Sequence, residues 1–291
     1  MAVQLIVSDL DGTLLDTHHR LHASTIKVLR LLAEQGHHIA LASGRHYHDM
    51  GVFRDQLDIP IHLISTNGAY THDPAGQLLN ASYLQPDHAQ TLIQLPRPPE
   101  VRLSLYRESG WHVDAPAPHL LSIHATTGFT YQVVPPEKMD ADGVGKVLYL
   151  GDPAALAELE SQAYQAHGQG LHITYSTSDA LEIMAGGVNK GVALSALLEK
   201  LGLAAADCLA FGDNLNDIEM LNLAGEAQVM ANAHPALFQR VTGARRIGHH
   251  SDAGVAQWLT KRFKLQEAVD VSSRSRQRPF LVQSCCRARR E

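Results

Sequence analysis

The sequence is poor in cysteine and has no long apolar run, and each scarcity excludes a class of protein. Only three cysteines occur among 291 residues, Cys208 in an expected core strand and Cys285 beside Cys286 near the end, so no disulfide framework is indicated. No segment is long and apolar enough to span a membrane, and the first residues lack the basic and apolar parts of a secretory signal. We therefore expect a cytoplasmic protein without membrane contact.

A basic surplus is missing as well. The chain carries 24 Lys and Arg against 30 Asp and Glu, a formal net charge of -6, which offers no electrostatic footprint for nucleic acid. The 18 histidines include no Cys or His spacing typical of a zinc site, so most of them are expected on the surface. The hydrophobic fraction of 45% is enough for the core of one large or two moderate domains.

What the chain does have is a pair of carboxylates at the end of its first apolar run. Residues 3–8 read as a short buried strand, and Asp9, Asp11 and Gly12 follow it directly. Ligands of open parallel sheets bind beyond the carboxyl ends of the strands, so both acids are expected at a site. Residues two apart share a strand face, so these carboxylates repel each other unless a cation or a shared proton intervenes. Magnesium is the economical solution, although the pattern alone also fits an ordinary Asp-Gly turn.

Three further polar segments follow in the same chain. An apolar run leads into Ser43, Gly44 and Arg45, where a hydroxyl and the amides of an expected helix start favour an anion such as phosphate. Lys190 ends a loop before an amphipathic run, and another apolar run delivers Asp213. Taken singly, Ser43 is also a helix cap and Lys190 also a solvated surface charge. Only the presence of all four segments in this order favours a catalytic site over these structural roles.

Together the four segments resemble the motifs of the haloacid dehalogenase superfamily of phosphatases. Those motifs are an Asp-x-Asp-Gly-Thr strand end, a Ser or Thr strand end, a lysine and a Gly-Asp-x-x-Asn-Asp segment; residues 9–13, Ser43, Lys190 and 212–217 match them without departure. Residues 64–69 are further similar to the Cof-type branch, and the resemblance covers nearly the whole chain. It implies a Rossmann-like parallel-sheet α/β core with an inserted α/β cap domain.

The resemblance also implies a role for each motif residue. Asp9 is the nucleophile that forms an aspartyl-phosphate, Asp11 is the acid and base, and Lys190 is the third catalytic residue. Neighbouring acids are expected to raise the proton affinity of Asp11. Magnesium is held by the Asp9 carboxylate, the Asp11 backbone carbonyl and the Asp213 carboxylate, with Asp217 in the metal shell. The substrate-binding residues are expected to be Thr13, Ser43, Gly44, Arg45, Asn67, Lys190 and Asn216.

Some assignments have structural alternatives that the residues leave open. Asp217 is also favoured in the first turn of a helix, and Asn67 with Gly68 is also a hairpin turn. His46 and His48 follow the phosphate turn, so contact with the leaving group is a less favoured alternative to a surface position.

The implied activity is hydrolysis of small phosphorylated metabolites with Mg²⁺ as cofactor. A finer likeness in residues 207–213 and 247–250 implies 4-amino-2-methyl-5-hydroxymethylpyrimidine diphosphate (HMP-PP) as the substrate and its monophosphate as the product. Broad action on sugar phosphates or pyridoxal phosphate is the alternative, and a phosphomutase or a non-catalytic binding protein is a more distant one. The expected partner is therefore a small phosphorylated molecule, while the residues give no oligomeric state.

The hydrophobic pattern divides the chain. Strands and helices alternate at first, which is typical of a parallel sheet, and after residue 83 a proline-rich break leads to alternating segments that we interpret as half-buried strands of a second sheet. The predicted parts are core over 1–83, cap over 84–185, core over 186–265 and a disordered basic tail over 266–291.

A cap inserted between the phosphate turn and the lysine is expected to close over the substrate, exclude water and select the leaving group. Tyr106, Trp111, Glu182 and Met184 are candidates for that contact, with core packing as the alternative.

Overall fold

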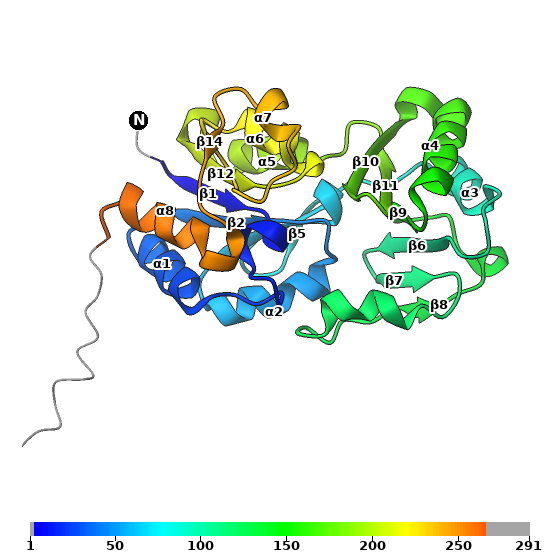
Figure 1. The fold of residues 1–291 in the computed structure, drawn as a ribbon, viewed down its shortest axis with the longest axis horizontal. Coiled ribbons are helices and arrows are strands. Elements are labelled where there is room, and N and C mark those ends of the chain that lie inside the picture. Colours follow the sequence, from blue (N-terminus) through cyan, green and yellow to red (C-terminus); the bar gives the residue numbers. More distant parts are fainter. Residues whose placement is uncertain (1–2, 266–291) are drawn as a thin grey trace, which may run out of the picture.

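The computed structural model describes residues 3–265, which form two lobes side by side (Figure 1). The predicted basic tail, 266–291, lies outside the described residues together with Cys285 and Cys286. Among residues 3–265 we find no helix with the length and apolar character needed to cross a membrane.

The first lobe is built on a sheet whose order within the described residues is β14-β13-β12-β1-β2-β3-β4-β5. Its pairs are parallel from β14 to β3 and antiparallel from β3 to β5. The strands are β1 (Leu5–Ser8), β2 (His38–Ala42), β3 (Ile61–Ser65), β4 (Tyr70–His72), β5 (Leu78–Ala81), β12 (Cys208–Gly212), β13 (Glu226–Val229) and β14 (Arg245–Arg246). The predicted Rossmann-like fold class is confirmed.

Helices cover both faces of this sheet, as the parallel pairing requires. One face is covered by α1 (Ala23–Glu34), α2 (Tyr47–Leu57) and α8 (Gly254–Arg262); the other is covered by α5 (Lys190–Leu201), α6 (Ile218–Leu223) and α7 (Leu237–Arg240). Helix α5 begins after Asn189, whose side chain caps it by accepting a hydrogen bond from the Val192 amide. It ends at Gly202, which adopts the left-handed conformation with φ 68°.

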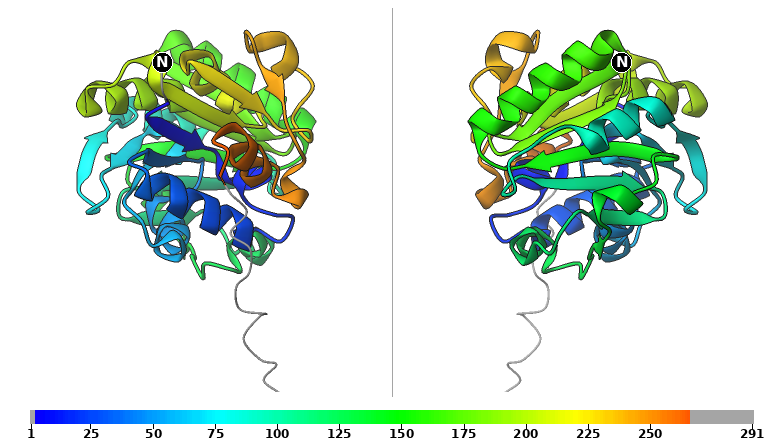
Figure 2. Two further views of the ribbon diagram at one scale, coloured as in Figure 1. Left: turned by 90° about the vertical axis from the view of Figure 1, so that its left-hand side faces the viewer. Right: turned by 90° about the vertical axis from the view of Figure 1, so that its right-hand side faces the viewer.

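The second lobe lies between β5 and α5 in the chain and contains a second sheet, of order β10-β11-β9-β6-β7-β8 within the described residues. Its strands are β6 (Arg102–Arg107), β7 (Gly110–Val113), β8 (Gln132–Val133), β9 (Val144–Leu150), β10 (Leu171–Thr177) and β11 (Ala180–Ala185). Helices α3 (Pro86–Gln94) and α4 (Pro153–His167) cover the face turned away from the first lobe (Figure 2). We call this lobe the cap, and its boundaries at residues 84 and 185 stay a proposal.

The expectation of half-buried cap strands is wrong for β6 and β9, which are buried on both faces. Leu103, Val147 and Tyr149 pack under α3 and α4 on one face. On the opposite face, Trp111 and Leu148 form a second apolar cluster with partly buried residues of the segment 117–131. Trp111, a candidate for substrate contact, is therefore core packing.

Candidate active site

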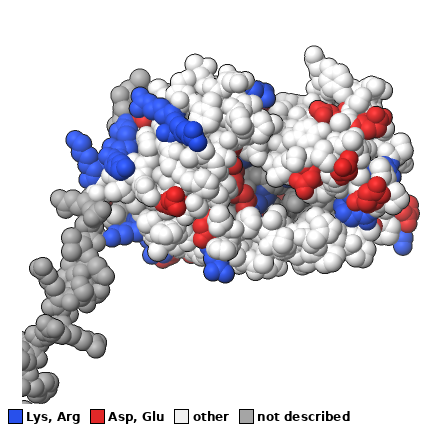
Figure 3. All heavy atoms as spheres, in the orientation of Figure 1, with Lys and Arg blue, Asp and Glu red and all other residues white. Residues whose placement is uncertain are grey.

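Four segments meet at one edge of the first sheet, beyond the carboxyl ends of its strands. Asp9 follows β1, Ser43 follows β2 and Asp213 follows β12, while Lys190 begins α5. Because β1 lies between β12 and β2 in parallel register, the residues after these strands lie at one level. This edge is the usual ligand crevice of a doubly wound sheet. The space-filling view shows a hollow between the lobes, with acidic side chains along it (Figure 3).

Lys190 lies at the centre of the buried charges. Its ammonium donates to Asp9 Oδ1 at 2.6 Å and to Asp217 Oδ1 at 2.7 Å, and its side chain is 0% exposed. Burial lowers the pKa of Lys190, but the two carboxylates outweigh this effect and raise the pKa above its ordinary value. The ammonium is therefore charged, and the alternative of a solvated surface lysine is wrong.

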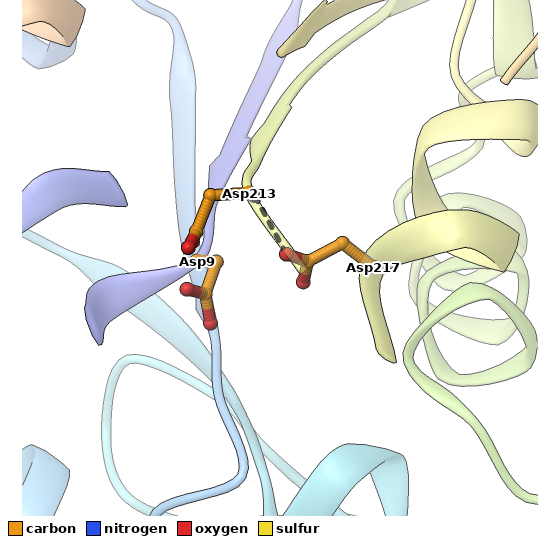
Figure 4. A group of neighbouring side chains, drawn as sticks. All are labelled: Asp9, Asp213 and Asp217. Carbon is orange, nitrogen blue, oxygen red and sulfur yellow. Dashed lines mark hydrogen bonds between the residues drawn. The ribbon is translucent and has the colours of Figure 1, made fainter. Parts of the chain in front are cut away.

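Three carboxylates lie close together beside this lysine: Asp9, Asp213 and Asp217 (Figure 4). Oxygen atoms from all three lie within 4.8 Å of one another. Asp217 Oδ2 also accepts hydrogen bonds from the amides of Asp213 at 2.9 Å and Asn214 at 3.0 Å. Burial raises the pKa of Asp9 well above its ordinary value against the effect of Lys190, and burial with Asp217 raises the pKa of Asp213 to about 7.

These donors fit a divalent cation. Carboxylate oxygens are the ligands that hard cations prefer, and the negative charge of three acids exceeds what Lys190 alone neutralises. Burial and the neighbouring acids raise the pKa values of Asp9 and Asp213, and a nearby positive charge would favour the ionised forms of both. The predicted metal residues Asp9, Asp213 and Asp217 are thus brought together, while the metal contact of the Asp11 carbonyl stays a prediction.

The turn after β1 packs directly against Asp213. Thr13 Oγ1 donates to Asp213 Oδ1 at 2.6 Å, and Asn232 Nδ2 donates to the Gly12 carbonyl at 2.7 Å. Gly12 has φ 81°, and a Cβ at this position would overlap the Asp213 carboxyl, so both conformation and space require glycine. The Thr13 hydroxyl therefore orients Asp213, and its predicted contact with substrate stays a prediction.

The Asp11 carboxyl points to a different set of partners. Arg45 Nε donates to Asp11 Oδ2 at 2.6 Å, Arg45 Nη2 donates to Oδ1 at 2.7 Å, and His19 Nδ1 lies 2.8 Å from Oδ1. Burial raises the pKa of Asp11, but hydrogen bonds from Arg45 and His19 outweigh it and hold the pKa well below its ordinary value. The expectation that neighbouring acids raise the proton affinity of Asp11 is wrong here, because a bidentate guanidinium faces this carboxyl.

The turn after β2 is joined to the turn after β3. Ser43 Oγ accepts from the Arg45 amide at 3.2 Å, and the Ser43 carbonyl accepts from the Asn67 amide at 3.0 Å. Helix α2 begins only at Tyr47, with His46 as its N-cap. A helix start at Ser43 and a capping role for Ser43 are therefore both wrong, and phosphate binding by Ser43, Gly44 and Arg45 stays a prediction.

Asn67 is a turn residue whose side chain lies at the contact between the two lobes. Asn67 and Gly68 have φ 56° and 97° in the connection between antiparallel β3 and β4, which confirms the turn. The Asn67 side chain also bridges the lobes, because its Oδ1 accepts from Asn216 Nδ2 at 3.1 Å and its Nδ2 donates to Glu182 Oε2 on the cap. The turn is therefore confirmed, whereas substrate binding by Asn67 stays a prediction.

The cap makes direct contacts with α2 and the turn before it. His46, which is 0% exposed, is bonded through Nε2 to the Arg107 carbonyl at 2.7 Å and stacks on Phe129. Burial lowers the pKa of His46 to about 4, so the ring is neutral and Nε2 is the donor. Asp49, also 0% exposed, accepts from Arg45 Nη1 at 2.7 Å. His46 therefore joins the two lobes, which is neither the expected surface position nor the alternative leaving-group contact.

Several site residues were missed from sequence. His19 contacts Asp11, Asp49 binds Arg45, and Lys146 donates to the Gly44 carbonyl at 2.8 Å. The Arg45–Asp49 pair has the i, i+4 spacing of opposite charges, which is a readable signal. His19 and Lys146 have no such signal in the sequence, because each contacts its partner only after distant segments have folded together.

We expect the stability of the cation-free protein to fall as pH rises from about 4 to about 7. The pKa of Asp213 is about 7 in the folded chain against an ordinary 3.8, so the folded state binds more protons in this window. Mg²⁺ should reverse the loss above pH 7, by about 2.7 kcal/mol at a hundred times its Kd. Thermal unfolding with Mg²⁺ or with chelator, across pH, measures both effects.

The control for this measurement is Asp213→Asn, which should weaken both the pH dependence and the Mg²⁺ effect. An equal Mg²⁺ shift in wild type and in this variant would contradict the assignment of Asp213 as a ligand.

Three acids that fit a divalent cation, beside a buried lysine, suit an anionic substrate such as a phosphate ester. At the strand ends of a doubly wound sheet with an inserted cap, such a site is typical of a phosphoryl-transfer enzyme. A family model described as haloacid dehalogenase-like hydrolase matches residues 6–259, and the chain belongs to this family. The predicted superfamily and its Cof-type branch are thereby confirmed, and the protein is an enzyme of the phosphatase class.

Curated relatives resemble the chain over most of its length. It is 39% identical over 252 residues to an HMP-PP phosphatase of Cronobacter sakazakii, with 87% of this chain and 93% of that protein covered. An HMP-PP phosphatase of Shigella flexneri is 34% identical over 257 residues, with 88% and 94% covered.

Solved structures share the fold. A haloacid dehalogenase-like hydrolase from B. subtilis superposes with a TM-score of 0.79 at 24% identity, covering 89% of this chain and 99% of that one. Another from Bacteroides thetaiotaomicron has a TM-score of 0.76 at 22% identity, covering 90% and 100%.

Proposed function

We propose that the protein is a magnesium-dependent phosphatase that converts HMP-PP to the monophosphate through an aspartyl-phosphate on Asp9. The observation that carries the mechanism is the Asp9 carboxylate, held by the buried Lys190 at 2.6 Å beside Asp213. The substrate assignment is supported by relatives that bear the name HMP-PP phosphatase at 34% to 39% identity.

The first step transfers the phosphoryl group to Asp9. Lys190 holds Oδ1, so we assign the attack on phosphorus to Oδ2. The new bond joins Oδ2 to phosphorus, the bond from phosphorus to the leaving oxygen breaks, and Asp11 gives that oxygen a proton. Ser43 and Lys190 bind the non-bridging phosphate oxygens.

Asp11 can act as an acid only after its environment changes. In the structure its carboxyl is bound by Arg45 and His19, which keep its pKa low. A substrate that draws Arg45 away from Asp11 removes the bidentate bond to this carboxyl, which can then take up a proton from solvent. We therefore assign Arg45 and His19 as the groups that set the protonation of Asp11.

The second step releases phosphate. Asp11, now ionised, takes a proton from water while the water oxygen bonds to phosphorus, and the bond between phosphorus and Asp9 breaks. A divalent cation bound by Asp9, Asp213 and Asp217 would neutralise charge on the phosphate. We assign this cation as Mg²⁺, because an all-oxygen donor set suits it.

The deciding experiment is a phosphate-release screen of the full chain over many phosphorylated metabolites, with Mg²⁺ and with chelator. HMP-PP should rank first in kcat/KM, and chelator should abolish release. If hexose phosphates or pyridoxal phosphate ranked above HMP-PP, the substrate would be wrong and a broad-specificity phosphatase would remain. Absence of phosphate release without an acceptor would point instead to a phosphomutase.

A further inference from the structure

Two opposite charges of the cap are buried at its contact with the first lobe. Lys146 on β9 and Glu182 on β11 are 1% and 4% exposed, and Lys146 Nζ donates to Glu182 Oε1 at 2.9 Å. Lys146 is also opposite Tyr106 on β6, and its ammonium lies 4.3 Å from the centre of that ring.

Both charges reach across to the phosphate turn. Lys146 Nζ donates to the Gly44 carbonyl at 2.8 Å, and Glu182 Oε2 accepts from Asn67 Nδ2. A Cβ added at Gly44 would lie 3.5 Å from Glu182 Oε2 and 3.1 Å from Asn67 Oδ1, so these groups crowd the turn that follows Ser43. The pair therefore lies on the cap side of the turn that carries Ser43, Gly44 and Arg45.

Packing alone does not explain charges in this place. Desolvating an ion pair costs several kcal/mol, and apolar side chains of similar volume are commonly as stable or more stable. The phosphoryl-transfer steps assigned to Asp9, Asp11 and Lys190 make no use of either group. A buried donor and a buried acceptor beside the phosphate turn are, however, what a polar leaving group requires.

We propose that Lys146 and Glu182 bind the leaving group by an edge that carries a hydrogen-bond acceptor next to a donor. This inference rests on the proposed function, since the aminopyrimidine of HMP-PP has such an edge. The ring nitrogen accepts from Lys146 Nζ, and the adjacent exocyclic amine donates to Glu182. On binding, these atoms replace the Gly44 carbonyl and the Asn67 amide as partners of the pair.

The test is a cycle of two enzymes and two substrates. The substrates are HMP-PP and its analogue without the 4-amino group, and the variant is Lys146→Met/Glu182→Leu, which removes both charges together and leaves neither unpaired. Wild type should have a kcat/KM about 10- to 100-fold higher for HMP-PP than for the analogue, because losing a hydrogen bond to a charged group has an effect of about this size. In the variant, that ratio should fall to within about 3-fold of one.

A matched control removes an ion pair far from the site. Glu226 and Arg262 pair at 2.6 Å on the surface of the first lobe, and Glu226→Leu/Arg262→Met should keep the wild-type ratio. Unfolding by denaturant, measured for both variants, checks that each is folded at the temperature of the assay.

Each outcome separates the inference from the proposed function. The inference is wrong, and the proposed function is unaffected, in two cases. In the first, the cap variant keeps the wild-type kcat/KM ratio of HMP-PP to the analogue. In the second, wild type hydrolyses HMP-PP without preferring it to the analogue. If wild type hydrolyses other phosphate esters but not HMP-PP, the proposed substrate falls, and the assignment of an aminopyrimidine to this pair falls with it.

Discussion

Replacing Asp9 by Asn should lower kcat for phosphate release by at least about 10⁴-fold, the scale on which loss of a catalytic nucleophile acts. The amide cannot form the phosphorylated intermediate, whereas it keeps the size of the side chain and still accepts from Lys190. Initial rates at saturating substrate and Mg²⁺ measure the effect. Acid-quenched wild type should carry phosphate on Asp9, and the variant should carry none.

The control for this prediction is Asp58→Asn. Asp58 ends α2 in the left-handed conformation, with φ 51°, which Asn tolerates well, so the exchange of acid for amide is the same but lies away from the site. Its kcat should equal that of wild type. Phosphate trapped on any residue other than Asp9, or an Asp9→Asn variant within about 100-fold of wild type, would contradict the mechanism.

Replacing Lys190 by Met should reduce both stability and activity. The variant leaves two buried carboxylates, Asp9 and Asp217, without their cation, and removal of one partner from a buried pair costs about 3–5 kcal/mol. Loss of a positive charge beside the transferred phosphate should lower kcat by about 10²–10³-fold. Urea unfolding in chelator measures the loss of stability, and initial rates in Mg²⁺ measure the loss of activity.

A second substitution tests the physical reason for the lost stability. Asp9→Asn in the Lys190→Met background removes one of the uncompensated charges, so the double variant should be more stable than Lys190→Met alone. Because Lys190 has a raised pKa from these partners, its stabilising effect should be present throughout the neutral range. Equal unfolding midpoints for wild type and Lys190→Met would show that the ion pairs contribute nothing.

Much of the fold was predictable because its signals are local. The apolar run of residues 3–8 gave β1, and the alternation of strands and helices gave the parallel pairing of β1, β2 and β3. The cap was less predictable. β7, β8 and β11 were not recognised, and the burial of both faces of β6 and β9 comes from contacts with distant segments that no alternating pattern reveals.

The candidate site shows the same contrast between local signals, which were predicted, and contacts between distant segments, which were not. Asp9, Asp213 and Lys190 were placed at one edge because each follows a strand or begins a helix of a parallel sheet. The environment of Asp11 was predicted wrongly, since its proton affinity depends on Arg45 and His19 rather than on the neighbouring acids. His19 could not be foreseen, because it reaches Asp11 only through an irregular loop in which its own φ is 54°.

The order of residues along the chain thus determined the family, the sheet and the positions of the acids at its edge, since strand ends and motif spacing are properties of short segments. Only the tertiary structure decided which charges face each other. Arg45 meets Asp11 across 34 residues of chain, and Lys146 meets Gly44 across 102. The protonation of Asp11 and the contacts between the lobes depend on distances of a few ångströms between such segments, and those distances exist only once both lobes have folded against each other.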